Sequence, residues 1–168
     1  MAILVTHAHF DHVGAVAPLA RSHDCPVYTS GPAADVLLQI ESQVPPGLGP
    51  IEPYAADVRL EGDEVLQLAG LAVRCHRAPG HAPGHLVFEV SDPDDGQTVL
   101  LVGDVIFRGS VGRTDFPGCS WEELEASILA LYASCPLDAP VLSGHSGPTT
   151  LAHERDTNPF LDAVRAAG

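Results

Sequence analysis

Four side chains that can bind a metal ion lie within six positions near the start of the chain. His7, His9, Asp11 and His12 follow a short apolar run, residues 2–5, of the kind that forms a buried strand. In an extended segment His7, His9 and Asp11 point to one side, and a turn after Asp11 would bring His12 into the same space. The fold must therefore accommodate a dense group of imidazoles and a carboxylate at the end of a strand.

Polar residues also end other apolar runs further along the chain. Asp104 follows residues 98–102, a near-continuous apolar run that is typical of a strand covered on both faces. His81 lies in a segment rich in glycine and proline, and His145 follows the short apolar run 140–143. An unpaired carboxylate after a buried strand would be costly, and a bound cation would remove that cost. We therefore expect one site assembled from several strand ends.

Helices and strands are predicted to alternate along the chain. Apolar spacing and start signals predict helices over residues 13–21, 33–42, 120–133, 150–155 and 158–167. Pro18 is expected to end or bend the first of them. Ser120 and Glu123 form a capping-box pattern at the start of the third. Apolar runs predict strands at residues 2–5, 25–28, 98–102 and 140–143 and several more between 65 and 90, and residues 44–50 read as a loop. The alternation predicts a mixed α/β fold.

Composition excludes several classes of partner. The formal charge of −14 arises from 22 acidic residues against 8 arginines and no lysine, which excludes a nucleic-acid footprint. Apolar runs are far shorter than the roughly 20 residues of a membrane-spanning helix, and no secretory signal is visible. The four cysteines form no C-x-x-C pair. We expect a cytoplasmic protein with reduced thiols, one domain over residues 1–168, and neither nucleic acid nor membrane as a partner.

The ligand-type residues are numerous enough for two metal ions. Imidazole nitrogen and carboxylate oxygen suit zinc, iron or manganese. A lone histidine more often caps a turn or lies on the surface. We interpret His23, His76 and His153 as surface or packing residues because they have no partner pattern. The interpretation as ligands rests on the clustering of His7, His9, Asp11, His12, His81, Asp104 and His145.

The order of these motifs resembles that of a known superfamily. T-H-A-H-F-D-H, A-P-G-H-A-P-G-H, G-D-V-I-F and S-G-H follow one another as in the metallo-β-lactamase-fold hydrolases. V-G-R-T-D-F-P-G at residues 111–118 and the segment from G-H-S-G-P-T-T onward are similar to the glyoxalase II (hydroxyacylglutathione hydrolase) branch, especially its short bacterial members. The resemblance implies an α/β (α+β) fold, an αββα sandwich. Strands normally precede the first motif in this superfamily, so we expect a sandwich that lacks its N-terminal strands.

The resemblance also implies a binuclear metal site. One ion would be held by His7, His9 and His81 and the second by Asp11, His12 and His145, with Asp104 bridging both. We expect two divalent ions, zinc first and iron or manganese as alternatives. A metal-bound hydroxide would attack a small thioester substrate, and Asp11 would act as a catalytic residue by orienting that hydroxide.

Several alternatives share these motifs. A persulfide dioxygenase with a single iron also resembles the G-R-T-D-F segment, and lactonases and β-lactamases share the metal chemistry. A truncated, inactive metal-binding domain is a further alternative, and an uncovered sheet edge would favour a homo-oligomer. His85 is predicted to support the site without binding metal, and Arg113 and Asp115 are predicted to brace their loop by a salt bridge.

Overall fold

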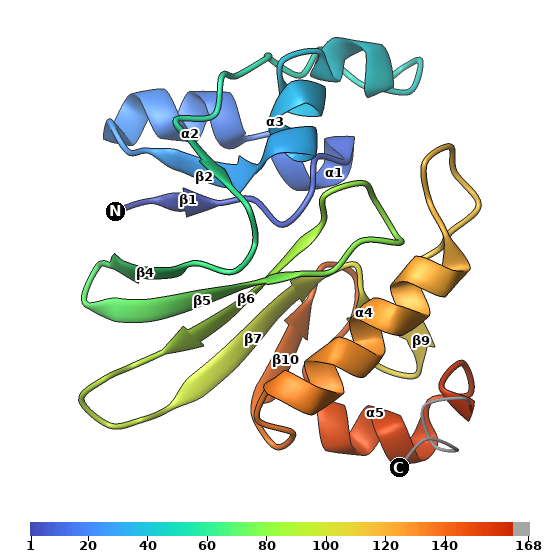
Figure 1. The fold of residues 1–168 in the computed structure, drawn as a ribbon. Helices are drawn as coiled ribbons and strands as arrows, with labels where there is room; N and C mark the ends of the chain where they lie inside the picture. The colour runs from blue at the N-terminus through green and yellow to red at the C-terminus, as the bar shows by residue number, and fades with distance from the viewer. Residues whose placement is uncertain (163–168) are drawn as a thin grey trace.

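Two β-sheets lie face to face, and helices cover the outer face of each (Figure 1). The computed structural model describes residues 1–162. The first sheet has the strand order β1-β2-β3 and contains β1 (Ile3–Leu4), β2 (Val27–Ser30) and β3 (Val58–Leu60). Both of its pairings are parallel. β1 comes first in the strand order and is therefore an edge strand, and its C-terminal end leads directly to the histidine-rich segment.

The second sheet has six strands in the order β11-β10-β7-β6-β5-β4. They are β4 (Val65–Leu68), β5 (Leu71–Arg77), β6 (Leu86–Ser91), β7 (Thr98–Gly103), β10 (Pro140–Ser143) and β11 (Thr149–Thr150). β6 runs antiparallel to both β5 and β7, and β10 runs parallel to β7. The C-terminal ends of β5, β7 and β10 therefore meet at one edge of the sheet.

Short helices follow the strands on each side of the sandwich. Beside the first sheet lie α1 (Phe10–Val13), α2 (Val16–His23), α3 (Gly31–Leu37) and the 3-10 helix η1 (Ile40–Gln43). Beside the second lie α4 (Trp121–Ser134), α5 (Leu151–Thr157) and a small hairpin of β8 (Ile106–Phe107) and β9 (Ser110–Val111). Across residues 1–162, no helix combines the length and apolar character needed to cross a membrane.

Three apolar layers hold the four layers of structure together. Val27 and Leu37 pack between the first sheet and its helices, and Phe88 packs between the two sheets. Leu100 and Val102 of β7 pack toward α4, whereas Leu101 lies in the layer between the sheets. This double burial explains why β7 reads as a continuous apolar run.

The structure confirms the predicted mixed α/β class and most of the elements. The run 98–102 lies in β7, residues 140–143 form β10, and three strands occupy the predicted stretch between 65 and 90. The Ser120 hydroxyl accepts the hydrogen bond of the Glu123 backbone N–H at 3.3 Å, so α4 begins where the capping pattern predicts.

Several boundaries differ from the prediction. The predicted helix 13–21 is interrupted at Gly14 and Ala15, and Pro18 lies in the first turn of α2, where its missing N–H costs no hydrogen bond. Helix α1 begins at Phe10, so the turn that gathers the site lies before Asp11 and not after it.

The predicted bounds of three further segments also differ from the structure or extend beyond the described residues. The helix predicted over 33–42 starts at Gly31 and ends at Leu37, before a separate 3-10 turn. The strand predicted at 25–28 lies two residues later, in β2. Most of the helical segment predicted over 158–167 lies outside the described residues, which end at 162.

Candidate metal centre

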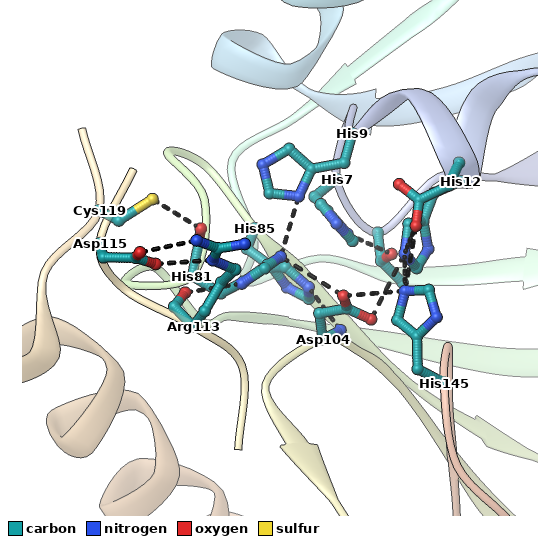
Figure 2. A network of polar contacts seen from close by, with 12 residues as sticks. His7, His9, His12, His81, His85, Asp104, Arg113, Asp115, Cys119 and His145 are labelled. Carbon is teal, nitrogen blue, oxygen red and sulfur yellow. Dashed lines mark hydrogen bonds and ion pairs between the residues drawn. The ribbon is translucent and has the colours of Figure 1, made fainter. Parts of the chain in front are cut away.

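The strand ends bring all seven predicted side chains to one place (Figure 2). β1 leads to His7 and His9, α1 carries Asp11 and His12, the β5–β6 turn carries His81, and the ends of β7 and β10 are followed by Asp104 and His145. The Leu86 N–H donates to the Thr6 carbonyl at 2.8 Å and so joins the segment after β1 to the start of β6. The site is therefore built where both sheets end.

Three histidines form what we call the buried half of the site, His7, His9 and His81. Each offers a ring nitrogen, and these nitrogens lie within 4.8 Å of one another. The Nδ1 of His81 lies 2.9 Å from the Arg113 carbonyl oxygen, which can only accept, so this nitrogen carries the proton. The other ring nitrogen of His81, Nε2, then has its lone pair free and faces His9 Nδ1 at 2.9 Å.

The burial of His7 points to a cation in this half. His7 is fully buried, and its Nε2 has no hydrogen-bond partner among residues 1–162. A buried polar atom without a partner costs free energy, of the order of 1–3 kcal/mol. A metal ion bound at Nε2 would remove that cost, because an imidazole lone pair is a ligand for it.

Three other side chains form the open half of the site, Asp11, His12 and His145. The Oδ2 atom of Asp11 lies 3.1 Å from His145 Nε2 and 3.8 Å from His12 Nε2. The side chains of Asp11 and His145 are 38% and 50% exposed, in contrast to 4% for His81. Water and substrate can therefore reach this half directly.

Asp104 lies between the two halves (Figure 2). Its Oδ2 atom is 3.5 Å from His81 Nε2 and 3.3 Å from His145 Nε2, and its Oδ1 atom is 3.4 Å from His12 Nε2. The carboxylate is 8% exposed, and within the described part of the chain Oδ1 has no hydrogen-bond partner. One buried carboxylate thus faces imidazoles of both halves, which is the position of a bridging ligand.

The protonation states suit metal binding. Burial, reinforced by neighbouring imidazoles, lowers the pKa of His7, His9 and His81, so these rings are neutral and keep a lone pair. Burial acts to raise the pKa of Asp104, but the contact with His12, with smaller contributions from His145 and His81, outweighs it and lowers that pKa. Burial acts to lower the pKa of His12, but its contacts with Asp104 and Asp11 outweigh that effect and raise the pKa. The buried half therefore presents neutral imidazoles beside an ionised carboxylate.

His85 supports this arrangement from behind. It is fully buried, and burial lowers the pKa of its ring to about 3, so the ring is neutral. Its Nε2 accepts the hydrogen bond of the Asp104 backbone N–H at 3.2 Å, and its ring stacks on His7 with centroids 4.6 Å apart. These contacts fit the supporting role that the sequence predicts.

Gly144 keeps the two halves close together. A Cβ atom at this position would lie 2.5 Å from Cε1 of His12 and 2.6 Å from Oδ1 of Asp104, closer than real Cβ contacts. A side chain on residue 144 would therefore displace a candidate ligand. The sequence analysis did not predict this role, because it depends on a contact between α1, β7 and β10.

The loop after β9 forms one rim of the site. Arg113 donates two hydrogen bonds to Asp115, at 2.6 and 2.7 Å, which confirms the predicted bracing of the loop. The Arg113 guanidinium lies 4.0 Å from the centre of the Phe116 ring, and that ring lies 6.1 Å from the His9 ring. Phe116 is 44% exposed and lies beside the buried half. Sequence reasoning also missed the Arg113 carbonyl, a backbone group that no residue type reveals.

The donor set fits one or two divalent ions. In the described residues three overlapping groups have ligand atoms within 4.8 Å of one another and lie at this site, namely His7–His9–His81, His7–His12–Asp104 and Asp11–His12–His145. All donors are nitrogen or oxygen, a combination that suits zinc, iron and manganese. The unpaired atoms of His7 and Asp104 lie at the points where such ions would bind.

Comparisons with known proteins agree with this arrangement. Residues 1–152 match the metallo-beta-lactamase superfamily. The chain is 38% identical to a probable metallo-hydrolase of Bacillus subtilis, YqgX, over 96% of this chain and 76% of that protein. It is 34% identical to the hydroxyacylglutathione hydrolase GloC of Haemophilus influenzae, with the same shares covered.

A solved structure extends the comparison to the metal site. TTHA1623, crystallised in a di-iron-bound form, is 41% identical to this chain and superimposes with a TM-score of 0.72 over 95% of this chain and 77% of that one. With its motifs, its two-sheet fold and its cluster of histidines and aspartates, the chain belongs to the metallo-beta-lactamase superfamily.

Proposed function

We propose that the chain is a two-metal hydrolase that cleaves small thioesters of the hydroxyacylglutathione type. The observation that carries the proposal is the placement of Asp104, whose two carboxylate oxygens face His81, His145 and His12. A site for a single metal ion would need Asp104 to face the ligands of only one half. The identity to GloC and to a protein that binds two irons supports the same proposal.

Each half of the site would hold one metal ion. His7, His9 and His81 would hold one ion, Asp11, His12 and His145 would hold the second, and Asp104 would bind both. Bound divalent ions would polarise the substrate carbonyl and lower the pKa of water toward neutrality. We propose zinc as the natural metal, with iron or manganese as alternatives, because nitrogen and oxygen donors suit all three.

Asp11 and Phe116 have separate tasks in this proposal. The exposed carboxylate of Asp11 accepts a hydrogen bond from the attacking water and orients it, because its Oδ2 lies at the open half beside His145. Phe116 offers an exposed apolar ring beside His9, against which the acyl or thiol part of a thioester packs. No protein nucleophile is required.

The decisive experiment measures metal content and substrate range on one preparation. The protein is loaded with zinc or iron, its metal per chain is determined, and hydrolysis of S-D-lactoylglutathione is compared with that of a lactone and a β-lactam. We expect two ions per chain and the highest kcat/KM with the thioester. Two ions with lactone or β-lactam cleavage alone would overturn the substrate class, and one iron with oxygen uptake would overturn the hydrolase.

A further inference from the structure

Another group of potential metal ligands lies on the second sheet and shares no residue with the candidate metal centre. It consists of His76 in β5, Glu89 in β6 and Cys135 at the C-terminal end of α4, with ligand atoms within 4.8 Å of one another. We call it the sheet–helix cluster. His76 is predicted from the sequence to lie on the surface or to pack, because nothing in the local sequence indicates these partners.

The strand register explains how the cluster forms. Glu89 pairs with Arg74 and Val87 pairs with His76, so His76 and Glu89 are diagonal neighbours on one face of the sheet. Val87 packs in the same apolar layer as Ile128 of α4, which shows that this is the face that α4 covers (Figure 1). The end of α4 then brings Cys135 to the two strand residues.

The contacts within the cluster converge on one atom. Nε2 of His76 lies 2.8 Å from Oε2 of Glu89 and 3.7 Å from Sγ of Cys135. In a catalytic triad the carboxylate and the nucleophile occupy opposite nitrogens of the imidazole, so that a proton can be relayed. Here both partners share a single nitrogen, and one N–H cannot satisfy both. The arrangement therefore differs from a relay, and it brings three potential ligand atoms to within 4.8 Å of one another.

Distances and burial both suit zinc. Zinc binds nitrogen and oxygen at about 2.0 Å and sulfur at about 2.3 Å with tetrahedral geometry, which separates neighbouring ligand atoms by roughly 3.3–3.6 Å. The observed separations of 2.8 and 3.7 Å lie on either side of this range, so small side-chain rotations suffice. The side chains of His76 and Glu89 are 14% and 15% exposed, which leaves access for a water molecule as the fourth ligand.

The Cys135 thiol would have to lose its proton to bind zinc. Cys135 is 8% exposed, and burial raises its pKa, so the metal-free side chain is a thiol. Zinc displaces such a proton when it binds, because the thiolate is the ligand. The Cys135 sulfur is not engaged in a disulfide.

We propose that His76, Glu89 and Cys135 form a zinc-binding site that fastens the end of α4 to β5 and β6. The site is structural, since it lies against the face of the sheet and uses side chains that the hydrolase centre does not need. It is independent of the proposed function, because it would bind zinc whether or not the chain cleaves thioesters.

The test is a titration of the metal-free chain with Co²⁺. Cobalt bound to a thiolate gives a charge-transfer band in the near ultraviolet, whereas the candidate metal centre offers only nitrogen and oxygen ligands. We expect a band that saturates when this site has bound one equivalent of cobalt. Added Zn²⁺ should abolish the band, and the Cys135→Ser variant should not show it. Elemental analysis of the zinc-loaded variant should find one ion fewer per chain than in the wild type.

Two further variants keep the result interpretable. Cys119→Ser is the matched control, because Sγ of Cys119 donates to the His81 carbonyl at 2.9 Å and is the thiol beside the main centre. We expect this variant to keep the band. His76→Gln, which retains a polar side chain opposite Glu89, should weaken it even if Cys135→Ser folds poorly. A band that is lost with Cys119→Ser, a band that does not saturate, or no band once the main centre is filled would each overturn the proposal.

Discussion

The two halves of the metal centre differ in burial more than in chemistry. In the buried half His7 and His81 are buried, and the Arg113 carbonyl fixes the tautomer of His81, so the His81 lone pair is oriented before any metal binds. In the open half Asp11 and His145 are 38% and 50% exposed. Preorganised ligands lose little freedom on binding, whereas exposed ligands must be ordered first. We therefore expect the buried half to bind its ion more tightly and the open half to admit water and substrate.

The largest expected effect comes from a substitution of Asp104, the carboxylate that lies between the two halves. Asp104→Asn keeps the shape of the side chain but removes its negative charge, which should lower kcat/KM for the thioester by about 10³-fold or more, since several kcal/mol of stabilisation depend on correctly held ions. The metal-free variant should be less stable than the wild type to thermal unfolding near neutral pH, because the lowered pKa of Asp104 means that the folded state favours the charged carboxylate. Near-normal activity with two ions bound would contradict the bridging role.

The comparison between the halves is tested by paired substitutions. His81→Asn should lower kcat/KM by about 10²-fold and resist rescue by added metal, because it removes a buried, preorganised ligand. His145→Asn should cost about 10-fold and should be rescued by excess metal, because the lost ligand is half exposed. The number of metal ions that remain per chain after brief exposure to a chelator measures how much more tightly the buried half holds its ion than the open half. Equal loss of both ions in the wild type would show that burial does not set the order of release.

A substitution that leaves every ligand in place sharpens the geometric argument. Gly144→Ala should reduce kcat/KM by roughly 10- to 100-fold, because the new methyl group would displace His12 or Asp104 and misplaced groups are costly in catalysis. Gly147→Ala is the matched control, since no atom of residues 1–162 outside its immediate neighbours lies within 4 Å of a Cβ there. An effect of similar size in both variants would indicate general strain in the loop after β10.

Sequence reasoning predicted the fold and the gathering of the site for physical reasons. Parallel strands that end at one edge must bring the residues that follow them together, and the residues after β5, β7 and β10 include His81, Asp104 and His145. Contacts across the sandwich could not be predicted in the same way. The fit of Gly144, the Arg113 carbonyl on His81 and the sheet–helix cluster each depend on distant segments or on backbone groups, which leave no spacing pattern in the sequence.

The smallest expected effect is that of a substitution at His85, which lies behind the buried half. His85→Phe keeps an aromatic ring against His7 but removes the acceptor for the Asp104 N–H, leaving that N–H unpaired. A buried unpaired donor costs about 1–3 kcal/mol, so the free energy of unfolding should fall by that amount. Metal affinity should fall about 10-fold, because groups that orient ligands affect binding less than the ligands themselves. Chemical denaturation and metal titration measure the two effects separately. If His85→Phe abolished metal binding altogether, His85 would have to be counted among the ligands, and the division into two halves joined only by Asp104 would fail.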